Sequence, residues 1–483
     1  MANNPPFPSA QDTLAQIIAA FPALTQHLST AIHNPTSAIL TPTDAATTSH
    51  LTTLATPGAP HPLPSALTSA LQIHTHRMQT SHPRFFSFTP SPASPLSWLA
   101  ETLTSAFNPF ANCLLEGAGV TLVEHTLISW LAGKIGFDPQ RAGGVFVSGG
   151  SVANLSALAV ARDRGLGVGD EGRGVAYVSA QTHSSVAKAL RILGLRGEGC
   201  VRVVGVEKGG FRMDVGELEG AVREDRGRGR VPFVVVASCG TTNTGAVDSI
   251  GEIKSVCERE GLWLHVDAAY GASVALSDVH GHLVEELRFA DSLSWDAHKW
   301  LFQTYGCGLV LVKDKKHLLD SFATDASYLR DVLEEEAAPN FWNYGIELTR
   351  PARGMKLWFT LHVLGVEAVG KMIDQGFLLA ERAERELRTR DDWEVISPAS
   401  LAIFTFRFRP PGKDAEELAR LNVAVSKKLF AENVAGIVTT EVLGKVCLRI
   451  CSINPWLAED EMAEVIDKMD ELAHRVLTER DLT

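Results

Sequence analysis

The 483-residue sequence predicts an α/β protein with a mainly parallel seven-stranded sheet in a large domain, a small C-terminal α+β domain and an N-terminal helical segment. Three observations predict this fold. Short apolar runs alternate with helical runs through the middle of the chain, which is the pattern of a parallel sheet covered by helices on both faces. A segment poor in charge precedes this alternation. A segment with a different pattern follows it.

The N-terminal segment, residues 1–95, is rich in Ala, Thr, Ser, Pro and His. Its stretch 9–28 has apolar residues at helical spacing, with Ser9 or Asp12 as a possible N-cap. The segment has too few apolar residues for a core of its own. We therefore expect it to pack on another part of the protein.

Seven runs of the middle segment, residues 96–365, are predicted to be strands. They are largely apolar and are separated by turn residues or helical runs, as expected for interior strands. The predicted strands are 143–148, 174–179, 200–207, 231–238, 262–267, 292–295 and 308–313. Helical runs such as 151–165 and 184–195 lie between them. Because ligands of such sheets bind at the carboxyl ends of the strands, the residues there are the first functional candidates.

The C-terminal segment, residues 366–483, has a different pattern. A charged helical run at 381–390 is followed by a predicted strand at 401–410, a helix near 414–433 and a strand at 445–453. A terminal helix completes the chain. This order of elements predicts a smaller α+β domain.

Composition excludes several classes of function. The net charge of -12 argues against a general nucleic-acid binder, because phosphate contacts need a basic face. No stretch approaches ~18 uninterrupted apolar residues, and the N-terminus lacks the pattern of a secretory signal, so no membrane association is expected. The seven Cys show no C-x-x-C spacing and are odd in number. We therefore expect no metal site, reduced thiols and a cytoplasmic location.

Two strand ends carry candidate ligand-binding residues. After the first predicted strand, Gly149–Asn154 (GGSVAN) opens a helix whose free N–H groups could bind an anion. A plain tight turn with Ser151 as N-cap is the alternative. After the second, His183 begins a helix, where it could stack on a planar ligand or be an ordinary loop histidine.

Two further strand ends carry a carboxylate and an amine. Asp267 closes the apolar run LWLHV, where a buried carboxylate needs a cationic partner unless it is only a helix N-cap. Lys299 follows the next strand in the stretch SWDAHKW. A partly desolvated lysine has a pKa below its usual ~10.4 and can react with a carbonyl, whereas a surface lysine would not.

Together these features match one cofactor. An anion cup, a stacking His, an Asp for a ring nitrogen and a Lys for an aldehyde correspond to the groups of pyridoxal 5'-phosphate. We therefore predict that Lys299 forms a Schiff base with this cofactor.

The motifs HVDAAYG, SWDAHKW, THSSV and GGSVANLSAL, in this arrangement, resemble the group II pyridoxal-phosphate-dependent amino-acid decarboxylases. That family includes aromatic-L-amino-acid, tyrosine, glutamate and cysteine-sulfinate decarboxylases. The resemblance covers about residues 60–480. It implies the large fold of fold type I pyridoxal-phosphate enzymes, and an obligate homodimer in which residues 1–95 pack across the partner subunit.

The resemblance also implies roles for single residues. Lys299 would carry the cofactor, and Asp267 would keep the pyridine nitrogen protonated. His183 would stack on one face of the ring and Ala269 on the other, with Thr241 beside it. The positions around the cofactor phosphate would be Gly149, Gly150, Ser151 and His298, and Asp296 would also belong to the cofactor site. Asp296 departs from the Asn found in aromatic decarboxylases.

The implied reaction is loss of carbon dioxide from an L-amino acid, followed by protonation at Cα. Tyr328, in the stretch DASYL, matches a loop tyrosine tied to that protonation in the family. The residues after it suit a lid or a solvated loop. Related enzymes couple decarboxylation to oxidative deamination and release an aldehyde. That outcome is associated with replacement of the loop Tyr or the stacking His, so the presence of Tyr328 and His183 favours simple decarboxylation.

The substrate is the least determined feature. By resemblance, the pocket wall includes Phe88, Phe110 and Asn112. The two Phe side chains suit a flat or apolar substrate, and Asn112 could accept a hydrogen bond from it. We therefore expect an aromatic or bulky L-amino acid. A fold type I aminotransferase remains the main rival, and a non-catalytic scaffold is disfavoured because Lys299 and Asp267 are both present.

Overall fold

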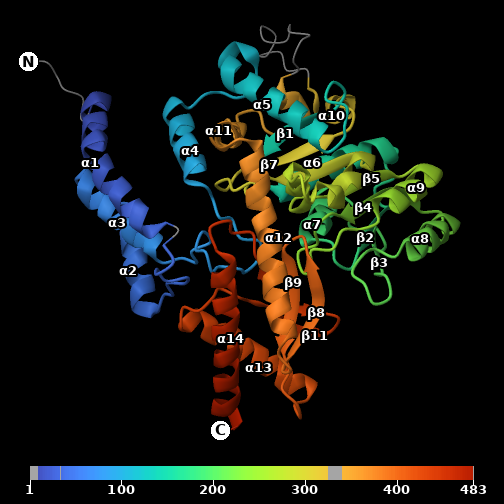
Figure 1. The fold of residues 1–483 in the computed structure, drawn as a ribbon. Helices are drawn as coiled ribbons and strands as arrows, with labels where there is room; N and C mark the ends of the chain where they lie inside the picture. Colours follow the sequence, from blue (N-terminus) through green and yellow to red (C-terminus); the bar gives the residue numbers. More distant parts are fainter. Residues whose placement is uncertain (1–8, 33, 325–339, 482–483) are drawn as a thin grey trace, which may run out of the picture.

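The computed structural model describes residues 9–32, 34–324 and 340–481. Figure 1 shows a body built around a large sheet, a second sheet beside the long helices α12 and α14, and a group of N-terminal helices that stands apart. None of the described helices is long and apolar enough to cross a membrane.

The large sheet has seven strands in the order β1-β7-β6-β5-β4-β2-β3. Its strands are β1 (Gly143–Val147), β2 (Gly174–Ser179), β3 (Val201–Val204), β4 (Val231–Ser238), β5 (Trp263–Asp267), β6 (Ser292–Asp296) and β7 (Gly308–Val312). The strands from β3 to β6 pair in parallel, and β7 runs antiparallel to both β6 and β1. The predicted mainly parallel seven-stranded sheet is confirmed.

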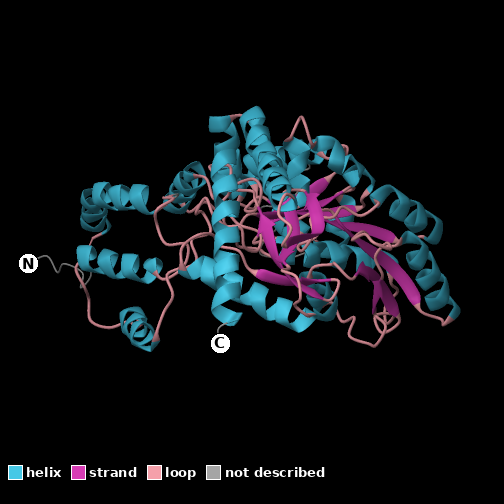
Figure 2. Ribbon diagram, turned by 60° about the horizontal axis from the view of Figure 1, so that its bottom comes forward, coloured by secondary structure: helices cyan, strands magenta, loops and turns pink. Residues whose placement is uncertain are grey.

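Helices cover both faces of this sheet (Figure 2). The helices of this part of the chain are α4 (Pro95–Phe107), α5 (Leu114–Lys134), α6 (Gly150–Gly165), α7 (Ser184–Ile192), α8 (Val215–Gly227), α9 (Ile250–Glu260), α10 (Lys316–Phe322) and α11 (Gly354–Leu364), with the 3-10 turns η1 (Gly271–Leu276), η2 (Gly281–Phe289) and η4 (Phe341–Tyr344). Every residue of β1, β2, β6 and β7 is buried. Burial on both faces explains why β1, β2 and β7 lack polar alternation in the sequence, whereas β6 alternates polar and apolar residues although it is equally buried.

The small sheet has four antiparallel strands in the order β10-β11-β9-β8. Its elements are α12 (Val366–Arg388), β8 (Trp393–Ser400), β9 (Ile403–Phe408), α13 (Ala415–Ala431), β10 (Thr439–Val442), β11 (Lys445–Cys451) and α14 (Glu459–Asp481). The sequence predicted β9 and β11 but missed the other two strands, which are largely half-buried and have weaker apolar patterns. The domain boundaries at 95/96 and 365/366 remain a proposal.

The N-terminal helices α1 (Ala10–Ala31), α2 (Ala45–Ala55) and α3 (Leu63–Thr75) contain no buried residue. Ser9 is the N-cap of α1, since its side chain accepts a hydrogen bond from the backbone N–H of Asp12. The segment therefore has no core of its own within one chain, as its composition predicted.

Candidate active site

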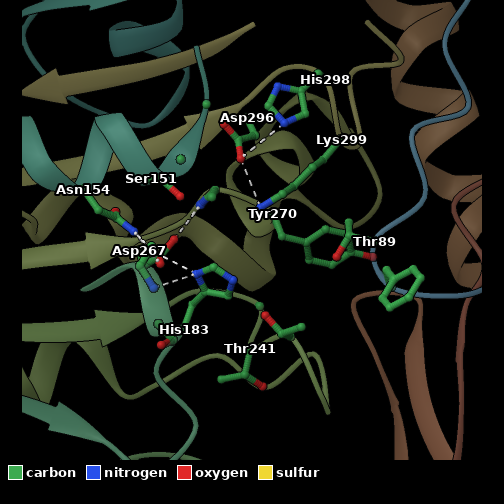
Figure 3. A pocket seen from close by; sticks show the side chains of 18 of the residues that line it. Thr89, Ser151, Asn154, His183, Thr241, Asp267, Tyr270, Asp296, His298 and Lys299 are labelled. Atoms are coloured by element: carbon green, nitrogen blue, oxygen red, sulfur yellow. Dashed lines mark hydrogen bonds and ion pairs between the residues drawn. The ribbon is translucent and has the colours of Figure 1, made fainter. Parts of the chain in front are cut away.

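A pocket of about 560 Å³ lies at the carboxyl ends of the large-sheet strands. It collects residues that the sequence analysis took from separate strand ends. Ten of the predicted site residues line it: Gly149, Gly150, Ser151, His183, Thr241, Asp267, Ala269, Asp296, His298 and Lys299. Phe88 also lines it. Figure 3 shows His183, Asp267 and Lys299 directed toward one space.

Asp267 ends β5 and has hydrogen bonds to both carboxylate oxygens. Oδ1 accepts from the Ser294 hydroxyl at 3.0 Å and from the backbone N–H of Ala269 at 3.2 Å. Oδ2 accepts from the Asn154 amide at 2.9 Å. Burial opposes ionisation of Asp267, but the positive charge of Lys299 and these hydrogen bonds outweigh it and lower its pKa. Asp267 is thus held as an anion that can pair with a protonated ring nitrogen.

Lys299 extends into the pocket from the turn after β6. Its Nζ lies 3.1 Å from Oδ2 of Asp296, which is itself 3.6 Å from Nε2 of His298. The other oxygen of Asp296 is buried and has no hydrogen-bond partner among the described residues. Burial lowers the pKa of His298, which favours its neutral form.

Two glycines at the start of α6 leave room beside these residues. A Cβ at Gly150 would lie 2.9 Å from Oδ2 of Asp296 and 3.2 Å from the Ala269 side chain. A Cβ at Gly149 would lie 3.1 Å from the His298 ring. Any larger residue would fill the space next to the helix N-terminus, where backbone N–H groups can bind a phosphate. This space beside Gly149 and Gly150, together with Asp267 and Lys299, fits pyridoxal phosphate.

His183 is the N-cap of α7, and its Nδ1 accepts the backbone N–H of Ser185 at 3.2 Å. The Ser185 hydroxyl lies 2.8 Å from the same nitrogen. Thr241 is positioned in a turn after β4, where its hydroxyl accepts the backbone N–H of Ala246 at 3.0 Å. Both side chains face the pocket that contains Lys299.

Phe88 forms part of the rim, with 56% of its surface exposed and a left-handed backbone conformation (φ 55°). The buried guanidinium of Arg449 on β11 donates a hydrogen bond to the Phe88 carbonyl. Tyr305 also lines the pocket, and its ring lies edge-on to the His298 ring with 5.5 Å between the ring centroids. The small domain therefore helps to hold an aromatic rim over the strand ends.

Two described residues that were predicted at the site do not line this pocket. Phe110 is half-buried elsewhere, and Asn112 is fully buried with neither side-chain polar atom hydrogen-bonded to a described residue. Their proposed contact with substrate stays a prediction. Tyr328 lies outside the described residues. Arg350 is buried in an ion pair with Glu124 and does not line the pocket.

Sequence reasoning missed several pocket residues, including Asn154, Ser185, Tyr270 and Tyr305. A signal existed for two of them. Asn154 lies four residues after Gly150, so both occupy one face of α6. Ser185 lies two residues after His183. Nothing in the sequence indicated that Tyr270 and Tyr305 face the same pocket.

Comparison with known proteins agrees with this geometry. Residues 47–409 match the pyridoxal-dependent decarboxylase conserved domain. The chain is 41% identical over 397 residues to the aromatic-L-amino-acid decarboxylase of Bacillus atrophaeus, covering 82% of each chain. It is 30% identical over 407 residues to tryptophan decarboxylase 2 of Oryza sativa subsp. japonica, covering 80% of this chain and 82% of that one.

A solved structure shows the same fold. The crystal structure of Oryza sativa TDC with PLP and tryptamine superposes with a TM-score of 0.89 at 24% identity, over 98% of this chain and 99% of that one. The predicted fold type I architecture, the cofactor pyridoxal phosphate and amino-acid decarboxylation as the reaction are thereby confirmed. The chain belongs to the pyridoxal-dependent decarboxylase family.

Proposed function

We propose that this enzyme converts an aromatic L-amino acid to the corresponding amine and carbon dioxide. The observation that carries the proposal is the composition of the rim. Phe88, Tyr305 and Ile403 line the pocket, and none of the described lining residues is an arginine. Such a wall suits a flat, uncharged side chain. It offers no guanidinium to pair with the side-chain carboxylate of an acidic amino acid. The names of the two relatives, aromatic-L-amino-acid and tryptophan decarboxylase, support the same substrate class.

The residues of the pocket would have these roles. Lys299 is the amine that would bond to the cofactor aldehyde, and Asp267 would pair with the ring nitrogen. His183 and Ala269 would flank the ring, and Thr241 would lie beside it. The residues proposed to surround the phosphate are Gly149, Gly150, Ser151, Asp296 and His298.

When bound, pyridoxal phosphate supplies an electron sink for the carbanion formed as carbon dioxide leaves. The protein's part is electrostatic and positional. The permanent charge of Asp267 keeps the ring nitrogen protonated, and the aromatic rim shields the reacting carbon from water. We propose Tyr328 as the group that delivers the proton to Cα. His183, which is present in the pocket, favours protonation over oxidation.

We also propose that the enzyme acts as a homodimer in a reducing cytoplasm. Helix α1 exposes Leu14, Ile17, Ile18 and Phe21, and α4 exposes Leu99, Leu103 and Phe107. A monomer rarely exposes so many large apolar side chains on neighbouring helices without a partner. All seven cysteines are free and buried, which suits a compartment where thiols stay reduced. The mass in solution, and its change in Ile18→Asp, tests the dimer.

The experiment is a substrate panel. The purified protein, supplied with cofactor, is given L-tryptophan, L-tyrosine, L-phenylalanine, L-glutamate and L-2,4-diaminobutyrate, with carbon dioxide, amine, ammonia and peroxide measured together. We expect stoichiometric carbon dioxide and amine from an aromatic substrate. Lys299→Ala should lack the borohydride-sensitive visible absorption of the wild type.

Other outcomes would change the assignment. Turnover of glutamate or diaminobutyrate alone would refute the aromatic substrate. Carbon dioxide accompanied by ammonia and peroxide would indicate aldehyde formation. Amino transfer to a keto acid without carbon dioxide would indicate an aminotransferase.

A further inference from the structure

A hydrogen-bonded chain of buried side chains extends from Asp267 away from the pocket. Asn154 is 1% exposed and His265 is fully buried. The Asn154 amide nitrogen donates to Asp267 Oδ2 at 2.9 Å, and its Oδ1 lies 3.0 Å from Nε2 of His265. Nδ1 of His265 lies 2.9 Å from the Ser292 hydroxyl, which accepts the Trp263 indole N–H at 2.8 Å. His265 itself does not line the pocket, and its hydrogen-bonded connection to Asp267 runs through Asn154.

The hydrogen bonds between Asp267, Asn154 and Nε2 of His265 each have one possible direction. An ionised Asp267 only accepts, so the NH2 group of Asn154 must face it and the amide oxygen must face His265. That oxygen also only accepts, so Nε2 of His265 must carry a proton. The Ser292 hydroxyl accepts the Trp263 indole N–H and can give its own proton to Nδ1 of a neutral His265. The chain therefore places a proton at Nε2 of His265 and offers a donor to its Nδ1.

The environment of His265 favours that neutral state. Burial lowers its pKa to about 4, although the negative charge of Asp267 acts in the opposite direction. Among the residues that the structure describes, Asp267 is the one charged group that influences the titration of the ring. The remaining neighbours, Asn154, Ser292 and Trp263, are uncharged.

The same amide also reaches His183. Asn154 Nδ2 lies 2.9 Å from the Ser185 hydroxyl, so its second proton is donated there. The Ser185 hydroxyl proton is then directed to Nδ1 of His183, 2.8 Å away, which already accepts the Ser185 backbone N–H. His183 is therefore a hydrogen-bond acceptor at Nδ1 and keeps its proton at Nε2.

We propose that His265 is a positioning residue that fixes the Asn154 amide, and that this amide orients both the Asp267 carboxylate and the Ser185 hydroxyl behind His183. Without the donor at Nε2 of His265, the amide could rotate and direct its oxygen at the carboxylate. This inference rests on the proposed roles of Asp267 and His183, but not on the identity of the amino acid. It assigns catalytic influence to a histidine that never touches cofactor or substrate.

The first test observes the wild-type protein directly. Full-length protein labelled with ¹⁵N-histidine is measured with cofactor between pH 5.5 and 8, and the two rings are assigned from the spectra of His265→Gln and His183→Gln. We expect both rings to carry a proton at Nε2, and we expect His265 to be neutral with signals that are independent of pH. A proton at Nδ1 of His265, or titration near the ordinary ~6.5, overturns the proposal.

The second test compares two variants of His265. Glutamine retains an N–H donor where Nε2 lies, whereas leucine has similar bulk and no donor. We expect His265→Leu to lower kcat roughly 10-fold with KM unchanged, as for leaving a buried acceptor unpaired, and His265→Gln to stay within about 3-fold of wild type. The matched control is His282→Leu, at an exposed histidine of η2, which should leave kcat unchanged.

The outcomes separate this proposal from the substrate assignment. Equal kcat values for the Leu and Gln variants of His265 would show a merely structural role and refute the proposal. If His265→Leu does not fold, the wild-type spectra alone decide. Failure of the aromatic panel with the expected spectra would refute the substrate and leave the positioning role intact, since the spectra require no substrate.

Discussion

Asp267 at the end of β5 and Asp296 at the end of β6 face the same pocket, but they differ in how their carboxylate oxygens are hydrogen-bonded. Asp267 has partners on both oxygens: Ser294 and the Ala269 backbone on one, and Asn154 on the other. Asp296 contacts Lys299 and His298 through one oxygen, and its other oxygen has no partner among the described residues. One carboxylate is held in place before any ligand binds. The other has bonding capacity left for a ligand.

The difference teaches how one pocket divides its tasks. A carboxylate that must stabilise charge on a cofactor ring works best when its orientation is fixed in advance. Asp296 lies beside Gly150 in the proposed phosphate site and has the same sign of charge as a phosphate. We therefore expect its charge to weaken the binding of the cofactor. The predictions below test this division, beginning with the largest effect.

Replacing Asp267 with Asn should have the largest effect. The substitution removes the charge opposite the ring nitrogen and presents an NH2 group to existing donors. We expect kcat to fall roughly 10²- to 10³-fold, as when a preorganised electrostatic partner is removed. Steady-state kinetics with saturating cofactor measures it. A loss of less than about 5-fold would contradict the assigned role.

The network behind Asp267 should make stability depend on pH. The folded-state pKa of His265, about 4, lies below the ordinary ~6.5, so the folded protein binds fewer protons than the unfolded chain between these values. Its contribution is present above pH 6.5 and is lost as pH falls toward 4. We expect a loss of roughly 2 kcal/mol between pH 7 and pH 5 that is absent in His265→Gln.

Urea denaturation of both proteins at the two pH values measures this difference. His82, whose pKa burial also lowers to about 4, titrates in the same range but is present in both proteins. Its contribution therefore cancels when the pH dependence of the variant is subtracted from that of the wild type. An identical pH dependence in the two proteins would show that His265 is not buried neutral.

Replacing Asp296 with Asn should have a smaller effect on kcat, and it should strengthen the binding of the cofactor. The substitution removes a negative charge next to the glycine cup, so cofactor affinity should rise about 3- to 10-fold while kcat changes by less than about 10-fold. Absorbance titration of the apoprotein with pyridoxal phosphate measures the affinity. Weaker binding would mean that the free oxygen of Asp296 accepts a hydrogen bond from the bound cofactor.

Phe88, on the rim of the pocket, provides a reference substitution that leaves both Asp267 and Asp296 in place. Phe88→Ala should raise KM for an aromatic substrate by about 5-fold and leave cofactor affinity unchanged, because a half-exposed ring contributes only part of its burial energy. Competition between L-phenylalanine and L-alanine for the enzyme measures the change in selectivity. An unchanged preference would remove Phe88 from the substrate wall.

Much of the fold and the site could be predicted from the sequence. The seven strands of the large sheet were visible as largely apolar runs, and β1, β2, β6 and β7 are buried on both faces. Lys299, Asp267 and His183 could be identified because a charged or titratable residue at the end of an apolar strand is costly to bury without a partner. The strands β8 and β10 were missed, since half-burial weakens the apolar pattern.

The sequence by itself determined the strand-end groups of the pocket, among them Asp267, Lys299 and His183, because residue type and strand order place them at one edge of the sheet. Only the tertiary structure decided how they are paired. Asp267 and Asp296 have the same side chain and similar positions, yet their partners come from α6 and β6 in one case and from the Lys299 turn in the other. Hydrogen bonds between residues over a hundred positions apart, such as Asn154 with His265 and Asp267, depend on packing that no local pattern records.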